Sequence, residues 1–318
     1  MRKILLAAAV VSTFAAPAAY AQFSANIGAV TDYRFRGISQ TLGKPALQGG
    51  VDYAHSSGLY VGTWLSTVSK DSYTNGKGLE VDIYAGWKKE VAKDWTIDVG
   101  ALYYWYPSAT YYTFGAGGTP ATAKSGNKYN NTELYGAVSY KWITAKYSYA
   151  TSNYFGASSQ AYNGSLGGVN SNNVPIVGTT SGPATGGSSK GSSYLDISAN
   201  YEFADKWTLN GHVGVLRVKT FGGLSYNDYK LGVTYDAGWA SLSAAVIGTT
   251  AKSEFYRVPN ASAVAAANGS TYDPTRPTLM VGITKTFSAF IASSKAAFGR
   301  LFVANFSRAT LAWKLLNP

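Results

Sequence analysis

The sequence contains no cysteine, so no disulfide can hold the fold together and no thiolate can bind a metal. Charged residues make up only 14% of the 318 residues, whereas a typical soluble domain has about 25%. Beyond the first 20 residues no apolar run approaches the roughly 20 residues that a spanning helix needs. Hydrophobic residues nevertheless make up 46% of the chain, and 25 residues are tyrosine. This combination predicts an all-β fold, a transmembrane antiparallel β-barrel in which apolar and polar residues alternate.

Patterns typical of catalytic and cofactor sites are also missing. The two histidines, His55 and His212, fall in separate predicted strands, and the sequence has no His-Glu-x-x-His helix and no nucleotide-binding loop. His55 has Ser57 nearby, but the pair is better interpreted as polar residues at a hairpin end than as part of a barrel lipase. We therefore expect no enzymatic activity, no bound metal and no cofactor.

The first 21 residues predict export from the cytoplasm. Arg2 and Lys3 precede an apolar run from Ile4 to Ala16, and Ala19-Tyr20-Ala21 has the small-x-small pattern of a signal-peptidase site. We expect cleavage after Ala21 and localisation in the bacterial outer membrane. The alternative, a retained membrane anchor, would have to include Ser12, Thr13 and Pro17 in the spanning run.

The formal net charge of +11 overstates how basic the predicted barrel is. Arg2 and Lys3 lie in the leader, and residues 288–318 hold four basic residues and no acid. These six account for part of the excess and leave +5 for residues 22–287. No basic cluster suited to nucleic acid is present, so we expect no nucleic-acid partner.

Alternation of apolar and polar residues predicts twelve strands. In the first of them Phe23, Ala25 and Ile27 share one face, and Ser24 and Asn26 share the other. The third is ambiguous because Tyr60 and Trp64 compete with Leu59, Val61 and Leu65 for the lipid face, and the eleventh is weak because Trp239 is out of phase. The predicted ranges are 23–36, 46–55, 59–68, 78–90, 95–106, 131–142, 144–154, 193–203, 207–218, 226–235, 239–250 and 278–287.

The lengths of the connections support a membrane barrel. Tight turns alternate with long segments rich in Gly, Ser, Asn and Thr, notably 107–130, 155–192 and 251–277, and outer-membrane barrels place such long loops outside the cell. Five tryptophans flank the short turns and predict the periplasmic aromatic girdle. A soluble β-sandwich gives no reason for this placement. The girdle residues are Trp87, Trp95, Trp142, Trp207 and Trp239.

The last predicted strand ends at Phe287, and a terminal aromatic strand is characteristic of bacterial outer-membrane proteins. We therefore divide the chain into a signal peptide, 1–21, an outer-membrane barrel, 22–287, and an extension outside the barrel, 288–318. The extension has a different composition and is either a readthrough or frameshifted tail or a periplasmic amphipathic appendage. We expect it to be poorly ordered or loosely helical.

Charged residues on the water-facing side of the predicted strands are candidates for lining a pore. They indicate either an aqueous path or a lumen closed by salt bridges, because a barrel of about 8 strands is filled by side chains and one of 16–18 leaves a channel. The candidates are Asp32, Arg34, Arg36, Asp52, Glu80, Asp82, Asp98, Glu133, Lys141, Lys146, Asp196, Glu202 and Lys230.

Three segments carry a family resemblance: Thr31 to Gln40, Pro45 to His55 and Ser57 to Trp64. They resemble the opening signature of the proteobacterial TorF-type porins, and 146–149 and 152–156 resemble that family's central segment. The resemblance implies an outer-membrane channel and brings no catalytic residues. Within the signature, Arg34 and Arg36 form either a constriction filter or ion pairs with Asp32, Asp52, Glu80 or Asp82, and we favour the ion pairs slightly.

The preferred function is a porin-like channel for passive diffusion of small polar or ionic solutes. The alternative is a closed structural or surface-interaction barrel whose long extracellular loops bind a partner. In both cases we expect contact with outer-membrane lipid and with the barrel assembly machinery, and the first adds small solutes. The sequence leaves the oligomeric state open.

Overall fold

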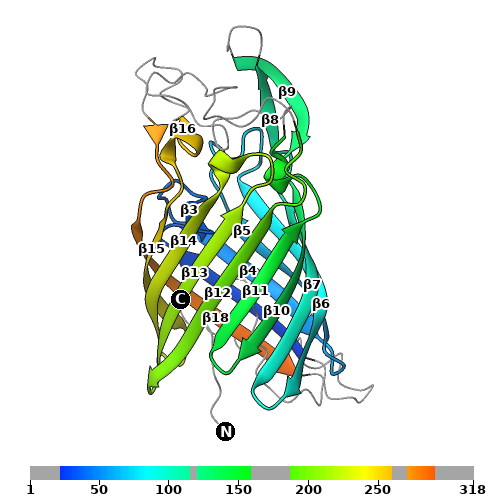
Figure 1. Ribbon diagram of the computed structural model, residues 1–318. Coiled ribbons are helices and arrows are strands. Elements are labelled where there is room, and N and C mark those ends of the chain that lie inside the picture. Colours follow the sequence, from blue (N-terminus) through cyan, green and yellow to red (C-terminus); the bar gives the residue numbers. More distant parts are fainter. Residues whose placement is uncertain (1–21, 115–119, 159–186, 260–270, 291–318) are drawn as a thin grey trace, which may run out of the picture.

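A computed structural model describes residues 22–114, 120–158, 187–259 and 271–290. Twelve antiparallel strands form a closed up-and-down barrel in which each strand pairs with its two neighbours (Figure 1). The barrel strands are β1 Gln22–Val30, β4 Ala46–Ala54, β5 Leu59–Thr67, β6 Leu79–Ala92, β7 Trp95–Trp105, β10 Asn131–Tyr140, β11 Ile143–Ala150, β12 Ser193–Ala204, β13 Trp207–Arg217, β14 Tyr226–Asp236, β15 Ser241–Thr249 and β18 Thr278–Phe290.

Closure between the first and last strands is confirmed. β1 pairs antiparallel with β18 from Gln22↔Phe290 to Val30↔Gly282, and with β4 on its other edge. This sheet has no free edge. A protein that spans a bilayer with strands must be closed in this way, because lipid offers no hydrogen-bond partners to an open edge. β18 ends at Phe290, three residues beyond the expected end at Phe287, so 288–290 pair with β1. The predicted signal peptide and the rest of the extension lie outside the described residues.

The outer wall is apolar, as a surface in contact with lipid must be. Leu279 is 65% exposed, Leu231 62% and Leu59 58%, and the residues between such positions point inward and are less exposed. A soluble protein rarely exposes so large a contiguous apolar surface. The molecule is therefore a transmembrane β-barrel. Among the described residues, none of the helices is long and apolar enough to span a membrane.

The prediction of a single strand over 23–36 is wrong for residues 31–36. The chain leaves the wall after Val30 and turns inward, where β2 Arg34–Phe35 and β3 Ile38–Ser39 pair as a short hairpin. Asp32 holds the start of this excursion by accepting hydrogen bonds from Ser39 Oγ (2.5 Å) and Thr41 Oγ1 (3.0 Å). The alternation of apolar and polar residues continues through the hairpin. The sequence pattern therefore does not show that the chain has left the barrel sheet.

Both weak strands are confirmed, and the structure explains their irregular patterns. In β5 the ring of Trp64 lies inward, with its centroid 5.3 Å from that of Tyr33, while Leu59, Val61 and Leu65 are exposed. Trp239 precedes β15 and lies in the turn, so it does not share the phase of the strand. Two long connections also contain strands: β8 Thr110–Phe114 pairs with β9 Pro120–Lys128, and β16 Val258–Pro259 pairs with β17 Thr271–Tyr272.

Candidate functional site in the barrel lumen

At the end that carries the long connections, the lumen is filled by a loop plug. We use this name for segments 31–45, 68–78, 106–111, 151–158, 218–225 and 251–258, whose buried residues pack together at this end of the barrel. Their aromatic rings form one buried cluster with inward-facing residues of the strands. Tyr111 and Tyr129 are 0% and 1% exposed and stack with ring centroids 4.1 Å apart. A cavity of about 70 Å³ remains within the plug, beside Tyr73, Tyr154 and Tyr226.

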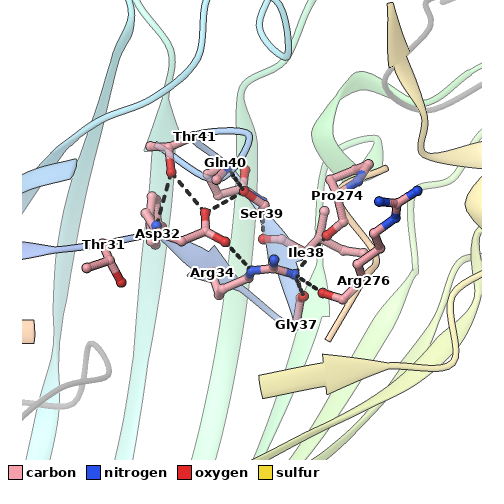
Figure 2. A network of polar contacts seen from close by, with 12 residues as sticks. Thr31, Asp32, Arg34, Gly37, Ile38, Ser39, Gln40, Thr41, Pro274 and Arg276 are labelled. Carbon is pink, nitrogen blue, oxygen red and sulfur yellow. Dashed lines mark hydrogen bonds and ion pairs between the residues drawn. The ribbon is translucent and has the colours of Figure 1, made fainter. Parts of the chain in front are cut away.

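Arg34 fixes the base of the β2–β3 hairpin (Figure 2). Its Nε lies 2.6 Å from Asp32 Oδ2. Its Nη1 donates to the carbonyl oxygens of Gly37, Pro274 and Arg276 at 3.1, 2.9 and 2.8 Å. Residues 274 and 276 precede β18, so this one side chain joins the first long connection to the last. The Arg34 side chain is only 1% exposed, and its contacts are those of a structural clamp.

Arg36 reaches across the lumen to the opposite wall. Its Nη2 lies 2.7 Å from Glu133 Oε2 on β10, and its Nη1 donates to Tyr154 Oη at 3.2 Å. The guanidinium carbon lies 4.1 Å from the ring centroid of Tyr194 on β12. Because both charged side chains are less than 10% exposed, the attraction is weakly screened, and removal of either partner would leave a buried charge alone.

The turn that presents Arg36 has the geometry of a two-residue hairpin loop. Arg36 and Gly37 both adopt positive φ, 48° and 81°, as a type I′ turn requires. A Cβ on Gly37 would lie 2.8 Å from Asp228 Cβ and 3.1 Å from the carbonyl oxygen of Gly248. The tip is therefore seated directly against β14 and β15, and glycine is needed there for both conformation and space.

Below the plug, much of the charge on the lumen wall is compensated. His212 on β13 lies between two carboxylates, with Nδ1 2.5 Å from Asp196 Oδ2 and Nε2 2.5 Å from Asp228 Oδ1. Tyr194 Oη also donates to Asp228, at 3.0 Å. On the adjoining strands β11 and β10, Lys146 Nζ lies 3.9 Å from the ring centroid of Tyr135, and Lys146 pairs across the strands with Asp196. Tyr60 Oη contacts Tyr135 Oη and donates to Asp98 Oδ1 at 2.6 Å.

Two carboxylates of β6 differ from this pattern. Glu80 and Asp82 are 0% and 2% exposed, and no described lysine, arginine or histidine lies within ion-pair distance of either. Glu80 Oε1 accepts a hydrogen bond from Tyr33 Oη at 3.2 Å, but Glu80 Oε2 and Asp82 Oδ1 have no hydrogen-bond partner. A buried carboxylate without a partner is costly unless a proton or a cation compensates it.

The half of the lumen at the short turns is different in kind. Here many inward-facing residues are small and polar, and these are half-buried although they point into the barrel. We call this region the vestibule. Half-burial of inward-facing polar residues indicates that water reaches them from this end. The residues that define the vestibule are Ser24, Thr96, Ser139, Thr144, Asn200, Thr208, Ser241 and Ser243.

The candidate pore-lining residues fall into three groups. Asp32, Arg34 and Arg36 belong to the plug and not to the wall, and Lys141 and Glu202 are exposed at the short-turn end. The remaining candidates lie on strands and are buried or half-buried in the lumen. They are Asp52, Glu80, Asp82, Asp98, Glu133, Lys146, Asp196 and Lys230.

The five tryptophans predicted to form the girdle lie at the short-turn end of the barrel. Trp95, Trp142, Trp207 and Trp239 are 40–62% exposed, whereas Trp87 is half-buried and donates from its indole nitrogen to the carbonyl oxygen of Ser57 at 3.1 Å. Three of the exposed indoles pack against tyrosines, at centroid distances of 4.7 Å to Tyr140, 5.5 Å to Tyr201 and 4.8 Å to Tyr235.

Sequence reasoning missed His212 and Asp228, which together with Asp196 form the densest charged group on the wall. Their inward parity in β13 and β14 was a usable signal, but the contact between them depends on the strand register. The aromatic plug was also missed, because its rings come from six separate connections. His55 and Ser57 do lie within hydrogen-bond distance, 2.8 Å, but in an exposed tight turn. Among the described residues, no group of three His, Cys, Asp or Glu side chains is arranged so that it could hold a metal ion.

This closed, lipid-facing barrel with a plugged lumen places the chain in the class of transmembrane β-barrel proteins. The chain belongs to the family described as "Bacterial protein of unknown function (Gcw_chp)", whose profile matches residues 14–287. A sequence search among curated proteins finds no match.

Solved porin structures resemble it at low identity. The KdgM porin is 8% identical, with 84% of this chain and 99% of that chain covered and a TM-score of 0.41. The NanC porin is 9% identical, with coverages of 85% and 100% and a TM-score of 0.41. OccAB4 of Acinetobacter baumannii is 10% identical, with coverages of 84% and 62% and a TM-score of 0.32. Likeness at this level carries no argument about the function of the chain.

Proposed function

We propose that the protein is an outer-membrane channel for small polar or ionic solutes, and that the loop plug closes it in this conformation. The observation that carries the proposal is the division of the lumen. A polar, half-exposed vestibule leads inward from the short turns to a plug made of connections. Connections can move without breaking the barrel wall, whereas a lumen filled by wall residues cannot open.

In outer-membrane barrels the short turns face the periplasm and the long loops face the outside of the cell. In the proposed orientation of this barrel, the short turns therefore face the periplasm and the plug faces outward. The same proposal includes export by a cleaved leader, insertion by the barrel assembly machinery and a relationship to the TorF-type porins. Outer-membrane lipid then surrounds the wall, and small solutes are the partners of the lumen.

A second candidate function is a closed structural barrel with a binding surface on its long loops. The burial of the plug aromatics favours it, since Tyr111 and Phe255 are at most 1% exposed. The two functions differ in one measurable respect: in a channel the plug is displaced from the lumen at times, and in a closed structural barrel it is not.

Conductance in a planar bilayer distinguishes them. We expect the purified full chain to give brief openings from a closed baseline. An Arg36→Ala variant should open more often, because it removes the contact of the hairpin with Glu133 and Tyr154. Absence of current from both proteins, each shown to be assembled, would contradict the channel and favour the closed barrel.

A further inference from the structure

We infer that the lumen selects cations and that Glu80 and Asp82 determine this selectivity, although the chain as a whole carries a formal charge of +11. The inference rests on the proposed channel function. It reverses what the two arginines of the opening segment suggest, because Arg34 is paired with Asp32 of the plug and Arg36 with Glu133 of the wall.

Ionisable side chains inside the barrel carry more negative than positive charge. Arg34 is paired with Asp32 and Arg36 with Glu133, so neither presents a free positive charge to the lumen. On the inward faces of the described barrel strands, buried and half-buried acidic side chains outnumber basic ones even if His212 is protonated. The acids include Asp52, Glu80, Asp82, Asp98, Glu133, Asp196 and Asp228, and the bases are Lys88, Lys146, Lys230 and His212.

The excess negative charge lies at Glu80 and Asp82. Asp98 shares a network with Tyr60 and Tyr135, and Asp196 and Asp228 share His212. Glu80 Oε2 and Asp82 Oδ1 have no hydrogen-bond partner, and no described basic side chain lies within ion-pair distance of either residue. Of the carboxylate oxygens on the wall, these two would therefore be stabilised most by a nearby positive charge.

Glu80 and Asp82 also lie on the route past the plug. Tyr33 of the plug donates to Glu80 Oε1, so Glu80 lies where the plug meets the wall. A solute that passes a displaced plug must pass Glu80 and then Asp82, which face the lumen from alternate positions of β6. Fixed charge at a narrow, low-dielectric point attracts counter-ions and repels ions of like charge. Other described basic residues are exposed at the connections, where solvent screens their charge over about 8 Å. Examples are Lys44, Lys70 and Lys219 at the long connections and Lys93, Lys141 and Lys206 at the short turns.

Reversal potentials under a potassium chloride gradient test the inference, using the full chain and the Arg36→Ala variant if wild-type openings are too brief. We expect cations to be preferred in the wild type. In Glu80→Gln/Asp82→Asn the cation-to-anion permeability ratio should fall by about fivefold or more, the effect of one unit charge about 4 Å from the ion even in water. Asp205→Asn, which removes an exposed acid from the tight turn after β12, should leave the ratio unchanged.

Anion preference in the wild type, or an unchanged ratio in a conducting double variant, would overturn the inference and leave the channel function standing. If the double variant fails to assemble, Asp82→Asn alone should show a smaller fall in the same direction, and an unchanged ratio there would also overturn the inference. Complete absence of conductance in assembled wild type and Arg36→Ala would overturn the inference together with the channel function.

Discussion

The two halves of the lumen are built from the same twelve strands but are filled in opposite ways. At the long-connection end, tyrosines and phenylalanines from six segments pack against the wall, and a single arginine reaches the opposite side. At the short-turn end, serine, threonine and asparagine face a space that water enters. The wall alone therefore does not decide whether this barrel conducts. The connections decide it, because they supply the residues that close one half.

The largest difference between the halves should appear at Arg36. Arg36→Ala leaves Glu133 buried without its partner, so we expect a loss of about 3–5 kcal/mol in the free energy of unfolding. Urea unfolding of the refolded barrel measures it. In the double variant Arg36→Ala/Glu133→Ala the loss should be smaller than in the single variant, since the orphaned charge is gone. Equal losses would show that the pair is not what holds the hairpin.

A smaller loss is expected from a hydroxyl inside the plug. Tyr111 Oη donates to the carbonyl oxygen of Phe155 at 2.5 Å, and both residues are buried. Tyr111→Phe keeps the ring and leaves the carbonyl oxygen of Phe155 without this donor, so we expect a loss of about 1–3 kcal/mol in the same unfolding experiment. A variant as stable as the wild type would indicate that water already reaches this part of the plug.

The turn of the hairpin gives a comparison between two glycines. Gly37→Ala should cost about 1–2 kcal/mol because an L-residue disfavours positive φ and the new Cβ would press on Asp228. At Gly211, on β13, a Cβ would meet nothing within 4 Å, so Gly211→Ala should change stability by less than about 0.5 kcal/mol. If both substitutions had the same effect, the tip would not be seated on the wall as described.

The smallest effect should come from the vestibule. Ser139 Oγ and Thr144 Oγ1 lie 2.8 Å apart, but both residues are half-buried and water can replace the lost partner. Ser139→Ala should therefore change the free energy of unfolding by less than about 0.5 kcal/mol. A loss as large as that of Tyr111→Phe would remove the distinction between the two halves.

The sequence predicted the wall well because side-chain parity in a strand is a local property. Alternation and the lengths of the connections were enough to find all twelve strands and their closure. The plug was not predictable in the same way. Arg36 finds Glu133 at a separation of 97 residues, and this contact depends on the hairpin leaving the sheet at Thr31. The turn at Arg36-Gly37 also lacks the Asn-Gly or Asp-Gly signal that usually identifies a type I′ hairpin.

The most direct test of the closed and open halves uses the absence of cysteine in the chain. Ser66 lies on the wall behind the plug and is 1% exposed, whereas Ser243 faces the vestibule and is half-buried. Ser66→Cys and Ser243→Cys are matched substitutions, and each gives one thiol that a small polar reagent can modify. The account predicts rapid modification at 243 and slow modification at 66, with the rate at 66 raised when Arg36→Ala is added. Equal rates at the two positions in the otherwise unaltered barrel would contradict it.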